Sequence, residues 1–234
     1  MPTISLLRNA MNASINELES LRERGLLEKQ FDDPVQQREA ATLGMWVFLS
    51  TEILFFGVLF ASYTICRILY PHGFAAASRE TDMLLGSIET AVLLTSSSLI
   101  ALGVRAIKLG QRTLAAWLLA GTAALGASFL VMHGFEYHKE WTEHLIPGLN
   151  FARGGPYARA IELFFCLYYF ITGFHSLHVL VGVCVIAGLA LRVSRGAFGP
   201  ERFTTLELAA LYWHLVDIVW IFVYPLIYLV GRSG

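Results

Sequence analysis

Charged side chains are scarce in this chain of 234 residues, and their scarcity decides its class. Asp, Glu, Lys and Arg together make up 15% of the residues, whereas hydrophobic residues make up 56%. A soluble domain typically has about 25% charged residues, and the mean hydropathy here is +0.57. The net charge of -1 also lacks the basic surplus of a nucleic-acid-binding protein. The composition predicts an integral membrane protein with no nucleic-acid partner.

Cysteine is rare as well, and its positions exclude two common kinds of site. Cys66, Cys166 and Cys184 are odd in number and show no paired spacing, so neither a disulfide framework nor a zinc motif is expected. All three lie in apolar runs, where cysteine is usually a small packed residue. The first 40 residues lack the apolar core of a secretory signal, so no signal peptide is expected.

Long hydrophobic runs dominate the rest of the chain. Each of five runs has about the 20 residues that a membrane-spanning helix needs. The predicted fold is an all-α, polytopic membrane bundle, residues 34–234, preceded by a polar, partly helical tail, residues 1–33. The first helix should have Asp33 as its cap and Pro34 in its first turn, and it should end before Pro71. The spans are expected at about residues 44–68, 83–105, 114–136, 160–191 and 206–230.

Local patterns add three expectations. In the tail, Ser14 and Glu17 have the spacing of a helix capping box. In the third span, small residues recur at every fourth position and should face a neighbouring helix; they are Ala116, Ala120, Ala124 and Ser128. Basic residues favour the loops after the second and fourth spans, which predicts a cytoplasmic N-terminus and an external C-terminus.

The last span carries the most informative polar residues. His214 and Asp217 lie near its middle, although a carboxylate at the centre of a span costs about 2.5–3.5 kcal/mol. They are three residues apart and so share one face of the helix. Glu52 in the first span and His178 in the fourth should lie at a similar depth, because a helix rises about 1.5 Å per residue. We hypothesise that Glu52, His178, His214 and Asp217 form one buried polar cluster, with His175 nearby.

Three roles are open for this cluster: ligation of a metal or haem, a proton relay, and hydrogen bonds that fix helix packing. The spacing of the histidines has no specific metal signature, so no metal site is predicted. Glu89, His133 and Glu136 lie nearer to the ends of their spans. They are expected to be secondary polar positions with a structural role. Pro225, after the polar positions of the last span, should kink that helix.

Three ordered motifs resemble one known family. GMWVFLSTEILFFGVLF, FITGFHSLHVLVG and YWHLVDIVWIFVYPLIY are similar to segments of the haem-copper oxidase subunit III family, the third subunit of cytochrome c oxidase. SIETAVLLTSSS and the pair Glu136-Tyr137 resemble the intervening parts. The resemblance covers about residues 43–231. Mitochondrial-type members have seven helices, and this chain resembles the five-helix bacterial form that lacks the first two.

The resemblance implies an accessory subunit without a redox centre, in a proton-pumping oxidase of aerobic respiration. Haem and copper belong to subunits I and II, and cytochrome c is the electron donor of the complex. Subunit III would pack on subunit I in the bacterial plasma membrane, hold phospholipids, and support proton uptake and stability during turnover. Glu52 matches the glutamate of the family that reacts with carbodiimide. His175 and His178 match the motif GFH..H, and His214 and Asp217 match WH..D; proton-supporting or structural roles are expected for them.

Two alternatives accompany this assignment. Third subunits of quinol oxidases and proteins associated with nitric-oxide reductases share the five-helix pattern within the family. Outside the family, a small transporter would line a substrate path with similar buried acids. Such transporters typically show internal repeats or broken helices, and no internal repeat is visible in this sequence.

Overall fold

The computed structural model describes residues 19–20, 28, 30–149, 151–152, 154–196 and 203–229. Its regular elements in this part of the chain are all helices, without a β-strand. Five of these helices are long and apolar enough to cross a membrane, which confirms the prediction of an all-α bundle with five spans. The chain divides into two compact units, Met1–Phe48 and Leu49–Gly234. The capping box predicted at Ser14 and Glu17 lies outside the described residues.

The first spanning helix, α2 (Pro34–Leu69), begins and ends where the sequence predicted. The Asp33 carboxylate accepts a hydrogen bond from the Gln36 backbone N–H at 2.7 Å, and this caps the first turn. The Gln36 side chain in turn accepts from the N–H of Asp32 at 2.8 Å. At the other end, a proline disfavours helical conformation in the residue before it. The chain therefore turns there and starts the short helix α3 (Pro71–Ser78).

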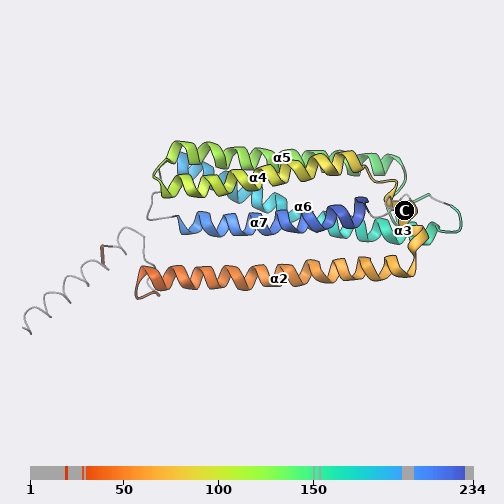
Figure 1. Ribbon diagram of the computed structural model, residues 1–234, viewed down its shortest axis with the longest axis horizontal. Coiled ribbons are helices and arrows are strands. Elements are labelled where there is room, and N and C mark those ends of the chain that lie inside the picture. Colours follow the sequence, from red (N-terminus) through yellow and green to blue (C-terminus); the bar gives the residue numbers. More distant parts are fainter. Residues whose placement is uncertain are drawn as a thin grey trace, which may run out of the picture. The chain divides into compact units, whose positions relative to one another are not determined.

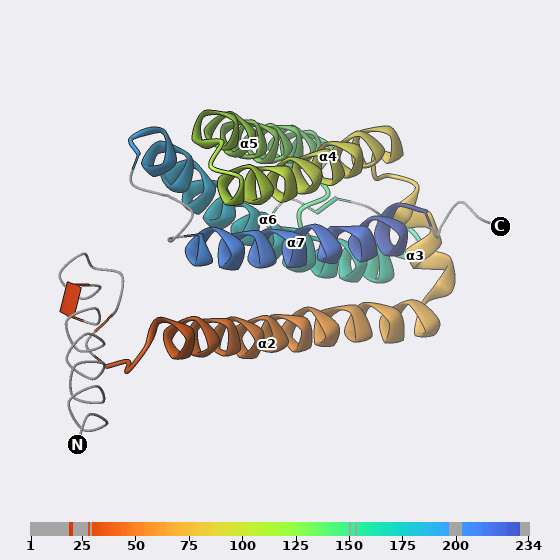
Figure 2. The ribbon, with the colours of Figure 1, turned by 60° about the vertical axis from the view of Figure 1, so that its left-hand side comes forward.

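Four further helices form the bundle shown in Figures 1 and 2. They are α4 (Met83–Lys108), α5 (Arg112–Thr142), α6 (Ala158–Ser194) and α7 (Thr204–Tyr224). Both α4 and α6 pack on α5 and α7, so each helix of the bundle has two neighbours. The connection between α4 and α5 is only three residues long, and such short connections make neighbouring helices antiparallel.

The centre of the bundle is organised around Trp213 on α7, which has no exposed surface. Its ring lies against Gly126 on α5 and Gly182 on α6. A Cβ atom built at either glycine would come within 2.6–2.8 Å of the ring, closer than van der Waals contact allows. The indole N–H donates to Ser96 Oγ on α4 at 3.0 Å. Trp213 therefore contacts all three other helices of the bundle.

The small residues of α5 that were expected to let another helix approach closely lie outside the buried stripe of that helix. Ala120 and Ala124 are exposed in this chain, and Ala116 is only partly buried. The buried stripe lies one position away and includes Ala115 and Leu119. Small residues allow close approach on either face, and this buried stripe also contains small residues, Ala115 and Gly126.

The last helix changes its winding at Pro225. The segment Pro225–Leu229 (η1) is a π-helical turn that follows α7 directly. Proline has no N–H to complete the preceding turn, and the wider π-helical turn accommodates this break. The sequence predicted a kink at this residue, and the structure has a π-helical turn there. The turn places Tyr228 inside the bundle, where its side chain is fully buried.

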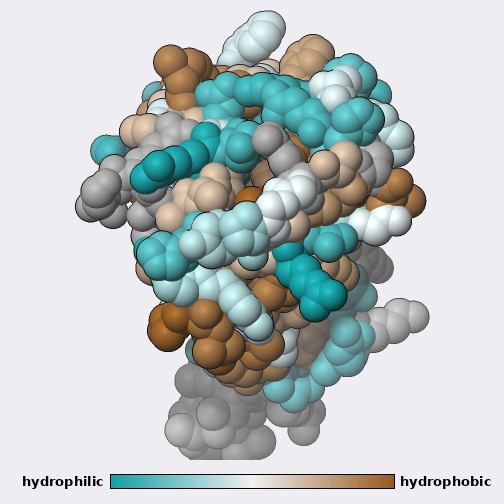
Figure 3. Space-filling model, turned by 90° about the vertical axis from the view of Figure 1, so that its right-hand side faces the viewer, coloured by the Kyte–Doolittle hydropathy of each residue, from teal (hydrophilic) through white to brown (hydrophobic). Residues whose placement is uncertain are grey.

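Polar residues mark the end of the bundle that carries α3. Seen from this end (Figure 3), hydrophilic side chains cover much of the surface. Here Asp82 caps α4, because its carboxylate accepts a hydrogen bond from the Leu85 backbone N–H at 3.2 Å. This bond lowers the pKa of Asp82 below its usual value, and the nearby Lys139 contributes in the same direction. The Lys139 ammonium lies 3.5 Å from the carboxylate.

Replacing Asp82 by alanine should lower the free energy of unfolding by about 0.5–2 kcal/mol, the usual loss for a helix cap. At pH 7, Asp82→Asn should lower the free energy of unfolding by less than Asp82→Ala does, because asparagine also caps helices. Since the pKa of Asp82 is lowered in the folded state, its charge stabilises the protein above about pH 4 and this contribution disappears as the pH falls. Thermal unfolding in mild detergent at several pH values measures both effects. Equal stability of Asp82→Ala and the wild type at pH 7 would contradict the cap.

Candidate functional site

The first polar contact between spans joins Glu52 on α2 to His178 on α6. Glu52 Oε2 and His178 Nε2 are 3.0 Å apart, and both side chains are mostly buried, with 18% and 19% exposed. The other ring nitrogen, Nδ1, lies 2.7 Å from the carbonyl oxygen of Phe174. A carbonyl only accepts hydrogen bonds, so Nδ1 carries a hydrogen. The contact between Nε2 and Glu52 therefore needs one further proton, held by either the imidazole or the carboxyl group.

His214 and Asp217 on α7 are not part of that pair. His214 Nδ1 bonds to the Ser97 hydroxyl on α4 at 2.7 Å. Neither carboxylate oxygen of Asp217 has a hydrogen bond within the described part of the chain, although its exposure is only 3%. The hydrogen bonds thus form two separate groups, Glu52 with His178 and His214 with Ser97. The single cluster of four predicted from the sequence is not what these contacts show.

His175 belongs to neither group. It is fully buried, and its two ring nitrogens have no hydrogen bond among the described residues. Its ring stacks on Trp220 at a centroid distance of 5.0 Å, and the edge of Phe129 packs against it at 5.5 Å. Although His175 and His178 are only three residues apart on α6, they contact different neighbours.

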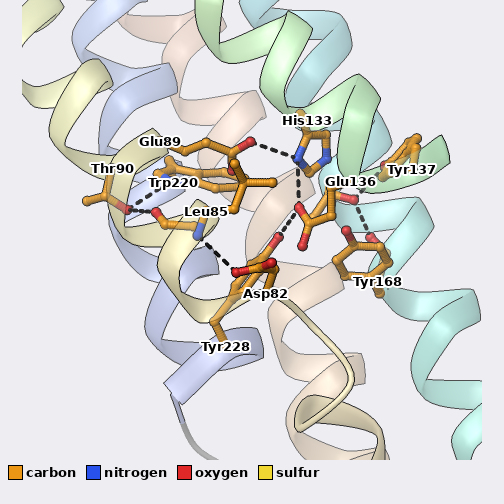
Figure 4. A network of polar contacts seen from close by, with 12 residues as sticks. Asp82, Leu85, Glu89, Thr90, His133, Glu136, Tyr137, Tyr168, Trp220 and Tyr228 are labelled. Atoms are coloured by element: carbon orange, nitrogen blue, oxygen red, sulfur yellow. Dashed lines mark hydrogen bonds and ion pairs between the residues drawn. The ribbon is translucent and has the colours of Figure 1, made fainter. Parts of the chain in front are cut away.

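The most deeply buried polar cluster lies between α4 and α5 and was predicted only as a set of secondary positions. Glu89 has no exposed surface, and His133 and Glu136 are each 2% exposed. Figure 4 shows the three side chains pointing toward one another. His133 Nδ1 lies 3.6 Å from Glu89 Oε1 and 3.4 Å from Glu136 Oε2. We call Glu89, His133 and Glu136 the α4–α5 cluster.

Neighbouring side chains hold the α4–α5 cluster in place. The hydroxyl of Tyr228 on η1 donates to Glu136 Oε2 at 2.8 Å (Figure 4). Phe129 stacks on the imidazole of His133 with an interplanar angle of 8°, and the edge of Trp220 meets the same ring. Glu140, one helical turn beyond Glu136, is another carboxylate with only 2% exposure.

A periodic signal in α5 could have identified this cluster. Its buried residues recur every three or four positions, which is the period of one helix face. The stripe continues without interruption from apolar residues to ionisable ones: Ala115, Leu119, Thr122, Gly126, Phe129, His133, Glu136 and Glu140. Judged by distance from the ends of the span, His133 and Glu136 looked peripheral. Judged by the stripe, they face the centre of the bundle.

These arrangements differ in what they can bind. The pair of Glu52 and His178 can share one proton between the imidazole and the carboxyl group. The α4–α5 cluster brings one imidazole nitrogen and two carboxylate oxygens within 4.8 Å of one another, so it can bind a proton or a metal cation. His214 and Asp217 offer no such group of three within the described residues.

Comparison with known proteins agrees with the motifs. The model of the family "Cytochrome c oxidase subunit III" matches residues 11–232. Cytochrome c oxidase subunit 3 of Thermostichus vulcanus is 34% identical over 192 residues, which cover 81% of this chain and 87% of the relative. Quinol oxidase subunit 3 of Bacillus subtilis (strain 168) is 28% identical over 193 residues, 82% of this chain and 88% of that protein.

A third relative has a different organisation. The haem-copper oxidase subunit I+III of Aeropyrum pernix is 31% identical over 196 residues, which cover 80% of this chain but only 22% of that longer protein. The family match spans nearly the whole chain, and it accompanies five apolar helices with the three ordered motifs. The chain therefore belongs to the haem-copper oxidase subunit III family.

Proposed function

We propose that this protein is the accessory subunit III of a proton-pumping haem-copper oxidase, with no redox centre of its own. In this proposal it packs on subunit I in a bacterial plasma membrane. The supporting observation is the relative from Aeropyrum pernix, whose name combines subunits I and III in one chain and which this chain matches over 196 residues. Two subunits encoded as one chain are held next to each other, and a separate subunit III would occupy the same place.

The second half of α2 provides an apolar surface for such contacts. In the most apolar stretch of α2 only 11% of the residues are buried within the chain, whereas the corresponding stretches of the other four spans are 33–50% buried. Large apolar side chains on it are more than half exposed, and in a membrane they can meet only lipid tails or another protein. We assign this surface to bound phospholipid and to a partner helix. The large apolar residues are Ile53, Leu54, Val58, Ile65 and Ile68.

A supporting role in proton uptake is proposed for Glu52 and His178. Their contact holds one proton in either of two positions, so the pair can take up a proton by forming this hydrogen bond and release it by breaking the bond. His214, Asp217 and His175 have no such partner among the described carboxylates. For them we propose structural roles in packing α7 against α4 and α6. Basic residues in the loops favour a cytoplasmic N-terminus.

The electron donor of the complex is proposed to be cytochrome c, passed through subunit II. This choice follows the relative named cytochrome c oxidase subunit 3, which is 34% identical to this chain. The quinol oxidase subunit 3 of Bacillus subtilis, at 28% identity over a similar length, supports quinol as the second candidate. A copper centre in the accompanying subunit II would indicate cytochrome c, and its absence would indicate quinol.

Replacing Glu52 by glutamine tests the accessory role. A group that transfers protons to reacting atoms contributes about 10²–10⁴-fold to the rate, so an accessory residue should change initial oxygen consumption by less than about tenfold. The change should appear instead as faster loss of activity during sustained turnover and slower proton uptake. Oxygen electrode traces of the assembled oxidase measure the rate and its decay, and a pH-sensitive dye measures the proton uptake. Glu39→Gln, an exposed position on the same helix, is the control, and immediate loss of turnover in an intact Glu52→Gln assembly would contradict the proposal.

A further inference from the structure

We propose that the α4–α5 cluster is a binding site for one divalent first-row transition-metal ion, with Glu89, His133 and Glu136 as ligands. This site would be structural, tying α4 to α5, and it is independent of the redox centres of any partner subunit. It goes beyond the accessory function proposed above and differs from the expectation from sequence that no metal binds.

The distances within the cluster fit metal ligands better than hydrogen bonds. An N–H···O bond has a length of about 2.7–3.2 Å, whereas His133 Nδ1 lies 3.6 Å and 3.4 Å from its two carboxylate neighbours. Zinc binds nitrogen and carboxylate oxygen at about 2.0–2.2 Å in tetrahedral geometry, which separates two ligands by about 3.4 Å. Both distances converge on the same nitrogen, as they would around a shared ion.

Buried polar atoms without a hydrogen bond give a second indication of a ligand. Both oxygens of Glu89 and both ring nitrogens of His133 lack a hydrogen bond among the described residues, and both side chains are at least 97% buried. An unsatisfied buried polar atom is costly, and native structures rarely keep several in one place. Figure 4 shows the Glu89 carboxylate and one ring nitrogen of His133 directed toward each other and toward Glu136. A metal ion there would provide a partner for both of these side chains and for Glu136 at once.

Charge balance favours a divalent ion. Glu89 and Glu136 carry two negative charges when ionised, and within a membrane-spanning bundle such charges need compensation. The carboxylate of Glu140, also buried, lies one turn further along α5. A divalent cation neutralises the two ligand carboxylates completely. A single protonated histidine neutralises only one of them.

The surroundings have the features of a metal site's outer shell. Metal-bound carboxylates are usually held by further hydrogen bonds, and Tyr228 provides one for Glu136. The imidazole of His133 is fixed between Phe129 and Trp220. One imidazole with two carboxylates suits zinc, manganese or iron(II) better than calcium or magnesium, which prefer oxygen ligands alone. We choose Zn²⁺ as the probe, with Co²⁺ as its coloured substitute.

Elemental analysis of the full chain, alone and in its oxidase complex, tests the site. The protein carries a tag without histidines, because a polyhistidine tag binds these metals itself. His133→Gln and Glu89→Gln each remove one ligand while keeping a polar side chain of similar size. Asp217→Asn is the matched control, since it neutralises a buried carboxylate on α7 outside the cluster. Thermal unfolding of every variant without metal shows whether it is folded.

The wild type and Asp217→Asn should retain about one transition-metal ion per chain after dialysis against a weak chelator. His133→Gln and Glu89→Gln should bind Zn²⁺ at least about tenfold more weakly, since even outer-shell changes cost 10–100-fold. In the wild type, Zn²⁺ should raise the thermal midpoint and Co²⁺ should give the visible bands of a nitrogen–oxygen site. Absence of these bands and of any midpoint shift in the folded wild type would overturn the proposal. So would equal Zn²⁺ affinity in wild type and folded His133→Gln.

These results are separable from those on the accessory function. Haem and copper can accompany the chain whether or not zinc does, because they belong to other subunits in the proposal. Loss of zinc binding with retained haem would therefore refute only the metal site.

Discussion

Trp213→Ala should lower the free energy of unfolding by about 3–5 kcal/mol, the usual cost of removing a buried tryptophan. The ring is fully buried and contacts the backbone of α5 and of α6 at two glycines. Its removal leaves a cavity that these helices can close only by moving together. It also removes the donor to Ser96 Oγ. Chemical unfolding in mild detergent, followed by circular dichroism, measures the loss.

The control for this prediction is Trp117→Ala on α5. Trp117 is 74% exposed, so its truncation removes few contacts within the chain and should change the unfolding free energy by less than about 0.5 kcal/mol. If the two tryptophan variants lose the same stability, Trp213 does not organise the centre of the bundle.

Gly182→Ala should be destabilising by about 1–3 kcal/mol, the usual cost of overpacking a well-packed core. The added Cβ would lie 2.7 Å and 2.8 Å from two ring carbons of Trp213, and this ring is fully buried. The helix and the ring would have to separate. The measurement is the same unfolding experiment in detergent.

Gly188→Ala, two turns further along α6, is the matched control. A Cβ built there meets no neighbouring atom of the described residues within 4 Å. The free energy of unfolding should therefore rise by up to about 1 kcal/mol, because alanine has a better helix propensity than glycine. The two predictions are also coupled: in a Trp213→Ala background, Gly182→Ala should cost little, because the ring it clashes with is gone. Equal effects of Gly182→Ala in both backgrounds would contradict the contact.

Much of the fold could be predicted because membrane crossing imposes simple rules of length and polarity. The five apolar runs specified the five helices, and the polar pattern around Asp33 specified the start of α2. The ends of the helices were harder to predict from the sequence. The third span was expected to end near residue 136, but α5 continues to Thr142, because hydropathy reports the apolar part of a helix and not its polar last turns.

The candidate site was harder to predict because spacing along one helix does not tell which neighbour a side chain meets. Glu52 and His178 were expected in one polar group and do contact each other. His214 was expected in the same group, yet its partner is Ser97 on α4. The direction in which each face of α7 points depends on packing around Trp213, which involves three other helices. The roles of these residues remain predictions.

The importance of the α4–α5 cluster was also hard to predict from the sequence. Position near the ends of two spans suggested a modest role for Glu89, His133 and Glu136. Burial depends on the neighbours as well as on depth: η1 contacts Glu136, and Phe129 and Trp220 pack against His133. The π-helical turn at Pro225 that brings Tyr228 inward could not be derived from hydropathy.

The account depends most on the proposal that this chain works within a haem-copper oxidase. Purification through a tag on this chain in mild detergent, followed by haem spectra and copper analysis of the material, tests it most directly. We predict that partner subunits carrying haem and copper accompany the chain in a constant ratio. A folded chain that purifies without any haem- or copper-bearing partner would contradict the account.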